Sequence, residues 1–199
     1  MEKDWTGNTR SAHAQLGARN FTEYDRETND YYATDPYAAT LLMEQERFSP
    51  RIWECACGEG HLSKEFQKAG YFVYSSDLID RGFGFVQDFL TTEAPPLPGF
   101  DIVTNPPYSK AREFVEHALE ILEDGHKIAM FLKIQFLEGK ARRALFDKFP
   151  PKVIYVSSSR LVCAMNGDFK KYANATAVCY AWFVWEKGYT GDTVIRWIN

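Results

Sequence analysis

The four consecutive residues Asn105, Pro106, Pro107 and Tyr108 have types and spacing that fit a defined chemistry. Each proline fixes its own backbone, and Pro107 also disfavours the helical conformation at Pro106. A stiff segment therefore presents the Asn105 side-chain oxygen and the Pro106 carbonyl oxygen, and both can accept hydrogen bonds from one planar amino group. Tyr108 adds a flat face on which an aromatic base can stack. We predict that these four residues are catalytic.

A glycine loop containing Gly58 and Gly60 is the second stretch with chemical potential. A short apolar run over 51–54 stops at Glu54, and residues 62–69 carry apolar side chains at helical spacing. The pattern predicts a strand, a tight loop and a helix. The backbone at the two glycines can approach a ligand closely, because no side chain intervenes.

The position of Asp77 in the chain indicates a role in binding a ligand. It follows a predicted second strand over 71–76, about twenty residues after the glycine loop, where an acid commonly holds a nucleotide ribose. Ligands of open parallel sheets bind beyond the carboxyl ends of the strands, near the point where the strand order reverses. A predicted strand over 100–104 ends directly before Asn105. We therefore expect the two loops to be neighbours, one holding a cofactor and the other a substrate.

The elements that position these loops alternate along the chain. Asp35 followed by Pro36 is typical of a helix start. Helices are expected over 36–46, 61–69 and 109–123 and around 141–146, and strands over 51–54, 71–76, 100–104, 127–134 and 152–156. Further strands over 178–185 and 193–197 are expected to pair as a terminal hairpin around Gly188. The alternation predicts an α/β fold with a mostly parallel seven-stranded sheet and helices on both faces.

Length and composition limit the remaining possibilities. At 199 residues, one domain over 31–199 is expected, after a polar arm over 1–30 that is flexible or orders on substrate. The aromatic content of 16 % is high enough to supply stacking surfaces as well as core. A net charge of −4 argues against uniform attraction to nucleic acid and leaves room for a local basic face.

The cysteines and the hydropathy of the chain bear on redox state and compartment. Cys55, Cys57, Cys163 and Cys179 form no C-x-x-C pair, so reduced thiols and no metal site are expected. No apolar run is long enough for a membrane span, and the polar N-terminus lacks a signal-peptide core. A cytoplasmic protein is expected.

With these residues in view, the chain resembles the S-adenosylmethionine-dependent DNA adenine-N6 methyltransferases, in particular the small phage and prophage enzymes. The similarity runs from about Tyr31 to the C-terminus. The glycine loop is similar to the family's D-P-x-C-G-x-G cofactor motif, with Glu54 and Cys55 in place of Asp-Pro. Residues 105–108 are similar to its catalytic motif in the adenine-type form, Asn-Pro-Pro-Tyr.

The resemblance implies a Rossmann-like class I methyltransferase fold and S-adenosyl-L-methionine as the cofactor. It implies that Asp77 binds the ribose hydroxyls, that Asp88 and Phe89 contact the cofactor adenine, and that the region around residues 32–34 closes over the methionine end. The cofactor-binding residues implied in this way are Tyr32, Thr34, Glu54, Cys55, Ala56, Gly58, Gly60, Asp77, Leu78, Asp88 and Phe89.

The resemblance also implies methyl transfer to the exocyclic N6 amino group of adenine in DNA. An adenine paired in a duplex cannot reach such a pocket, so a flipped base or a single-stranded substrate is implied. Three alternatives stay open: RNA as the acceptor, a protein glutamine side chain as the acceptor, and a catalytically silent nucleic-acid-binding module. DNA contacts are expected from the N-terminal arm or from a loop over 157–175 that contains Lys170 and Lys171.

Overall fold

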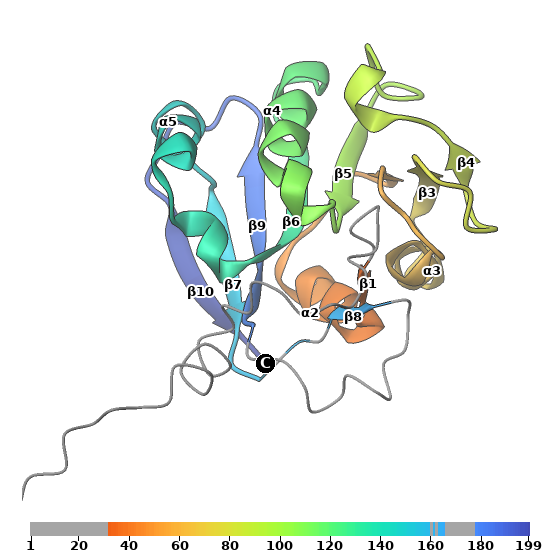
Figure 1. Cartoon of the computed structure of the whole chain (residues 1–199), viewed down its shortest axis with the longest axis horizontal. Coiled ribbons are helices and arrows are strands. Elements are labelled where there is room, and N and C mark those ends of the chain that lie inside the picture. The colour runs from red at the N-terminus through yellow and green to blue at the C-terminus, as the bar shows by residue number, and fades with distance from the viewer. Residues whose placement is uncertain (1–31, 160, 162, 166–177) are drawn as a thin grey trace, which may run out of the picture.

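The computed structural model describes residues 32–199 except 160, 162 and 166–177. Its centre is an eight-stranded sheet with the order β10-β7-β9-β6-β5-β2-β3-β4 (Figure 1). The strands are β2 (Arg51–Glu54), β3 (Phe72–Asp77), β4 (Phe85–Val86), β5 (Phe100–Thr104), β6 (Lys127–Lys133), β7 (Val153–Ser157), β9 (Tyr180–Glu186) and β10 (Val194–Ile198). Neighbouring strands are parallel except where β9 pairs with β6 and β7, which confirms the expected mostly parallel sheet.

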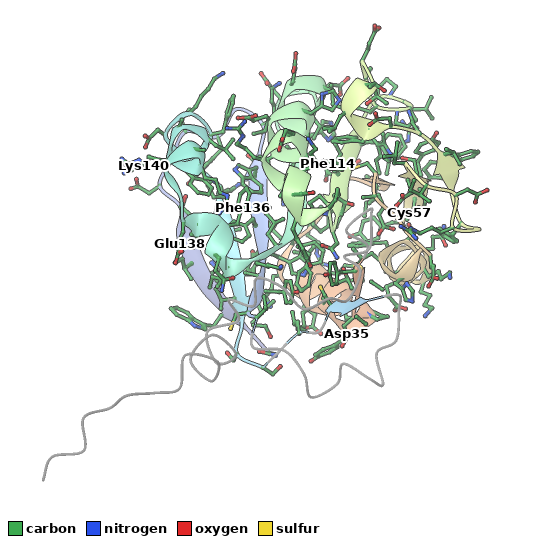
Figure 2. The ribbon with its side chains drawn as sticks, in the orientation of Figure 1. Asp35, Cys57, Phe114, Phe136, Glu138 and Lys140 are labelled. Atoms are coloured by element: carbon green, nitrogen blue, oxygen red, sulfur yellow. The ribbon has the colours of Figure 1, made fainter. Side chains whose placement is uncertain are left out.

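Helices cover both faces of the sheet, as the sequence predicts (Figure 1). The helices are α2 (Pro36–Gln45), α3 (His61–Lys68), α4 (Ala111–Ile121) and α5 (Lys140–Lys148), and 3-10 turns occur at η1 (Phe89–Thr91), η2 (Tyr108–Lys110) and η3 (Ile134–Leu137). One hydrophobic cluster joins the sheet to α4 and α5, and a second joins it to α2 and α3. Phe114 of α4 and Phe136 of η3 lie in the first of these layers (Figure 2).

Side chains of β6 show how the two layers are built. Ile128, Met130 and Leu132 enter the cluster with α4 and α5, whereas Ala129 and Phe131 enter the cluster with α2 and α3. Successive residues of a strand point to opposite faces, so a continuous apolar run supplies both layers at once.

The expected C-terminal hairpin is wrong in its pairing. β9 lies between β6 and β7 and is antiparallel to both, whereas β10 pairs in parallel with β7. Val153 of β7 therefore faces Val184 of β9 on one side and Val194 of β10 on the other. The reason is burial: β9 is buried as far as its last residue and needs a partner on each side. β10 is exposed except at Ile198, which suits the edge of a sheet. With β4 and β10 at its edges, the sheet has eight strands rather than the expected seven.

α2 begins at the residue that the sequence predicts. The carboxylate of Asp35 accepts a hydrogen bond from the Tyr37 backbone N–H at 2.9 Å, which satisfies one of the free donors of the first turn. The Trp182 indole of β9 donates to the Ala38 carbonyl at 2.8 Å and holds the helix on the sheet. α4 begins at Ala111, two residues later than expected, because η2 precedes it.

A two-stranded antiparallel ladder stands apart from the main sheet and was not predicted. Its strands are β1 (Tyr32–Thr34) and β8 (Cys163–Met165), and Thr34 faces Cys163 in the register. The sequence indicates an irregular loop over 157–175, so β8 replaces part of that loop with an extended segment.

The strand order reverses beside β2. From β2 the chain moves outward to β3 and β4 and then returns to β5 on the other side of β2, and all of these pairs are parallel. The carboxyl ends of β2, β3 and β5 therefore lie at one edge of the sheet, where Glu54, Asp77 and Thr104 end the strands. The expected proximity of the glycine loop and the Asn105 loop is confirmed.

Some expectations concern parts of the chain outside the described residues. These are the arm over 1–30 and the positions of Lys170 and Lys171. Among the helices that the structure describes, none has the length and apolar character needed to cross a membrane.

Candidate functional site

A cavity of about 290 Å³ opens at the edge where the strand order reverses. Its wall is formed by β1, by the loops that follow β2 and β3, and by the loop that follows β5. The predicted residues that line it are Tyr32, Thr34, Glu54, Ala56, Asp77, Leu78, Asn105, Pro106, Pro107 and Tyr108. The structure thus brings the two predicted loops together around one space.

Asn105 lines this cavity, and its amide is held in place from β1. Its Nδ2 donates to the Tyr32 carbonyl of β1 at 2.8 Å, which fixes the orientation of the amide. Its Oδ1 is buried and has no hydrogen-bond partner among the described residues. A buried amide oxygen without a donor costs roughly 1–3 kcal/mol, so this atom is set to accept from a ligand.

The two prolines and η2 carry the chain away from Asn105. Pro106 is buried, and Pro107 has the extended backbone (φ −57°, ψ 125°) that precedes the first residue of η2. The Lys110 backbone N–H donates to the Pro107 carbonyl at 2.9 Å and closes the turn. The segment is stiff, as predicted, because both proline rings fix φ and the turn after them is hydrogen-bonded.

Tyr108 is held on several sides. Its hydroxyl donates to the Cys163 thiol at 3.2 Å, and its ring centroid lies 5.7 Å from that of Tyr32 and 5.9 Å from that of Tyr180. The Lys133 ammonium lies 4.5 Å from the centre of the Tyr108 ring. Burial raises the pKa of the Tyr108 hydroxyl well above its usual range, so the hydroxyl stays protonated and donates. The sequence predicts a free stacking face here, whereas in the structure the Lys133 ammonium lies over one face of the ring.

Asp77 joins the glycine loop to the end of β3. Its Oδ2 accepts from the Gly58 backbone N–H at 2.8 Å, and its Oδ1 accepts from the Ile79 backbone N–H at 3.0 Å. An ionised carboxylate has about four acceptor sites, so two of them remain for a ligand. Asp77 therefore shapes the loop and lines the cavity at the same time.

Glu54 is the most deeply buried acid of the cavity wall, with 3 % of its surface exposed. Its Oε2 accepts from the Ser63 backbone N–H at 2.8 Å and also from the Ser63 hydroxyl. Burial raises the pKa of Glu54 to about 8 despite these two hydrogen bonds. The side chain is therefore mostly protonated at neutral pH.

The glycine loop needs glycine for two different reasons. Gly58 has φ 54° and Gly60 has φ 77°, a left-handed conformation that other residues adopt with strain. At Gly60 a Cβ would also lie 2.3 Å from the ring of Phe83. The group that approaches Gly60 is thus a side chain of the protein, and Gly60 is absent from the residues that line the cavity.

Several other predicted cofactor residues do not line the cavity. They are Cys55, Gly58, Gly60, Asp88 and Phe89. Phe89 is 2 % exposed and packs edge-on against Trp53 at 5.1 Å, so it belongs to the core. Asp88 caps η1 by accepting from the Leu90 backbone N–H at 3.0 Å.

Sequence reasoning missed other residues of the cavity wall. Among them are His61 at the start of α3, Ile79 and Arg81 after β3, and Lys110 at the end of η2. Burial lowers the pKa of His61, which leaves its ring neutral at neutral pH. Each of these residues lies within a few positions of a predicted one. Their closeness in sequence to the predicted loops was the only feature that could have identified them.

Comparison with known proteins finds matches to solved structures but none by sequence. No protein-family model matches the chain, and no curated protein matches it in sequence. The methyltransferase subunit of a type I restriction–modification system from Streptococcus thermophilus superposes with a TM-score of 0.60 at 16 % identity, over 86 % of this chain and 48 % of that subunit. The chain therefore spans about half the length of that subunit.

Two further structures have the same fold. A provisionally named class I S-adenosylmethionine-dependent methyltransferase from Listeria monocytogenes gives a TM-score of 0.55 at 13 % identity, over 94 % of this chain and 71 % of that one. A provisionally named hemolysin from Lactococcus lactis gives 0.56 at 12 % identity, over 79 % and 91 %. At such low identities the likeness establishes the fold alone, which is the Rossmann-like α/β fold found in class I methyltransferases.

Proposed function

We propose that the protein transfers a methyl group from S-adenosyl-L-methionine to the exocyclic N6 amino group of adenine in DNA. The observation that carries this proposal is the Asn105 side-chain oxygen, which is buried at the cavity, fixed in orientation, and without a donor among the described residues. An acceptor held in this way fits a substrate group that brings N–H donors. An aromatic amino group is such a donor and is planar.

The cavity wall beneath the glycine loop fits the cofactor. The carboxylate of Asp77 has free acceptor sites for two ribose hydroxyls, and Leu78 and Ile79 offer apolar surface for an adenine ring. S-adenosylmethionine, when bound, supplies an electrophilic methyl group. Ala56, Glu54 and Thr34 line the same space and complete the proposed pocket.

Asn105 and Pro106 would act on the nucleophile. The lone pair of an aromatic amino group is delocalised into the ring, so the nitrogen attacks poorly. Hydrogen bonds from its two N–H groups to the Asn105 side chain and the Pro106 carbonyl favour a tetrahedral nitrogen whose lone pair is free. Because both acceptors are fixed before the substrate arrives, they stabilise the transition state more than the ground state.

A nucleic acid is the acceptor class that the surroundings favour, and we propose DNA. The cavity is bordered by Tyr32 and Tyr108, whose rings suit a stacked base, and by Lys110, which suits a nearby phosphate. A base must leave the duplex to enter such a cavity. The superposition on a restriction–modification methyltransferase subunit supports the same acceptor class without establishing it.

Asn105→Ala tests the proposal directly. Its side-chain oxygen matters most when the nitrogen becomes tetrahedral, so single-turnover methyl transfer should fall by several orders of magnitude. Cofactor affinity, measured by calorimetry, should stay within a few fold. Gln67→Ala, an exposed amide on α3 outside the cavity wall, is the control and should leave both quantities unchanged. Transfer at the wild-type rate by Asn105→Ala would remove this loop from the active site.

A panel of acceptors decides the substrate. Duplex DNA, single-stranded DNA, RNA and a glutamine-containing peptide are offered with radiolabelled cofactor, and transfer to adenine N6 is expected in DNA. Transfer to RNA or peptide alone would overturn the DNA assignment. Cofactor binding with no transfer to any acceptor would identify a silent binding module instead.

A further inference from the structure

The β1–β8 ladder holds both functional side chains of the Asn105 loop from two strands that are far apart in the chain. From β1, the Tyr32 carbonyl accepts a hydrogen bond from the Asn105 side-chain amide at 2.8 Å. From β8, the Cys163 sulfur accepts a hydrogen bond from the Tyr108 hydroxyl at 3.2 Å. One small structural unit therefore fixes the proposed acceptor and the proposed stacking ring together.

Cys163 occupies the centre of these contacts. Its sulfur also lies 3.9 Å from Asn105 Nδ2, and its position opposite Thr34 in the ladder places it beside the cavity wall. Only 4 % of its surface is exposed, and burial raises the pKa of the thiol to about 12. The thiol therefore stays neutral and is poorly reached from solvent, which argues for a fixed contact rather than for reactivity.

We propose that Cys163 is a positioning residue that tethers the Tyr108 hydroxyl and thereby fixes the position of the ring on which the acceptor base stacks. The inference rests on the proposed function, because it gives a stacked base to the Tyr108 ring. Cys163 itself touches neither substrate nor cofactor in this account. It acts through Tyr108.

The geometry explains why a tether is needed at this position. Tyr108 begins η2 directly after Pro107, so its backbone is fixed while its ring turns about its own side-chain bonds. The neighbouring rings of Tyr32 and Tyr180 lie at 32° to it and are not stacked face to face. The hydroxyl–thiol contact holds the far end of the side chain, so the ring cannot swing about the Cα–Cβ bond and keeps its position.

A double-mutant cycle on Tyr108→Phe and Cys163→Ala tests the tether. Each single change removes the same contact, so each should weaken binding of a single-stranded oligonucleotide carrying 2-aminopurine by about two- to tenfold. The affinity of the double variant should equal that of whichever single variant binds the oligonucleotide less tightly, because the contact is lost only once. The fluorescence of 2-aminopurine reports stacking and requires no chemistry.

Matched controls keep the result interpretable. Cys179→Ala removes an exposed cysteine and should change neither affinity nor fluorescence. Cys163→Ser retains an acceptor and should recover part of the affinity that Cys163→Ala loses. Thermal unfolding of every variant identifies any that fails to fold, and Cys163→Val, which removes the acceptor and still fills the space, then replaces Cys163→Ala in the cycle.

The outcomes separate the tether from the proposed function. Losses that multiply in the double variant, or wild-type affinity in Cys163→Ala, would overturn the tether even if the wild type methylates DNA. Failure of the wild type to bind the probe would overturn it as well. Failure of the proposed function is read independently, as an absence of methyl transfer by the wild-type protein in the acceptor panel.

Discussion

Glu54 shows how a single side chain can couple the site to pH. The carboxyl group is almost fully buried, and its pKa is raised from 4.5 to about 8 because burial disfavours the ionised form. The two hydrogen bonds from Ser63 oppose this shift without cancelling it. At neutral pH the wall of the proposed cofactor pocket therefore carries Asp77 as an acceptor and a mostly neutral acid beside it.

Glu54→Gln should change how stability depends on pH. Below pH 4.5 the group is protonated in both the folded and the unfolded chain and adds no pH dependence. Between 4.5 and about 8 the unfolded chain loses this proton first, so the free energy of unfolding of the wild type falls as pH rises. The fall is at most about 1.4 kcal/mol for each pH unit. Glutamine has no such proton.

Urea unfolding at pH 5, 6.5 and 8 checks this prediction. The stability of Glu54→Gln relative to wild type should grow steadily across the series. Glu44→Gln, an exposed change on α2, should follow the wild type at every pH. A difference between Glu54→Gln and wild type that is the same at all three values would refute a raised pKa at Glu54.

What could be predicted at this scale depends on how local the chemistry is. Asn105 and Tyr108 were predicted from four consecutive residues, because the stiffness and the acceptors come from one segment. Cys163 was not predicted, because its proposed role comes from contacts with residues far away in the chain. Phe89 was assigned to the cofactor by resemblance, and the structure places its side chain in the core.

At the scale of elements, local signals located most of the structure. β2 and β5 begin and end at the predicted residues, because polar residues or glycine bound each apolar run. The β1–β8 ladder was missed because two three-residue strands have too little period to be recognised, and their pairing joins distant segments. The pairing of β10 was missed because sequence order favours a hairpin, whereas the burial of β9 demands two partners.

Asp35→Ala tests the cap that begins α2. Loss of the hydrogen bond to the Tyr37 N–H should destabilise the protein by about 1 kcal/mol, the usual effect of removing an N-cap side chain. Asp35→Asn keeps the acceptor and should cost less. Glu44→Ala, on the exposed side of the same helix, should have little effect. Chemical denaturation gives all three values, and an unchanged midpoint for Asp35→Ala would show that the cap adds nothing.

At the scale of the whole molecule, the net charge is negative although cations lie at the cavity. The chain carries a net charge of −4, yet Lys110 lines the cavity, and Lys133 at the end of β6 lies over the ring of Tyr108. Lys110 pairs only loosely with Glu113, at 3.7 Å, and its side chain is 57 % exposed. A local cation of this kind can meet a phosphate even though the protein as a whole is acidic.

Lys110→Gln should lower the salt dependence of DNA binding. If Lys110 contacts one phosphate, the slope of log K against log salt should flatten by about 0.9. Lys68→Gln, at the opposite end of α3 from the cavity, should leave the slope unchanged. Fluorescence anisotropy with a labelled duplex at several salt concentrations measures both. Equal slopes for Lys110→Gln and wild type would move the phosphate contact to another part of the surface.

The position of β9 in the sheet has a consequence for the order of folding. Its partners β6 and β7 precede it in the chain, and in the register Lys127 of β6 meets Glu186 of β9. During synthesis these two strands leave the ribosome with their shared neighbour still missing, so the facing edges of β6 and β7 stay unpaired until residue 186 has emerged. Contacts over such sequence separations form slowly because a long loop must close first. β6, the strand beside β5, thus gains its second neighbour late in folding.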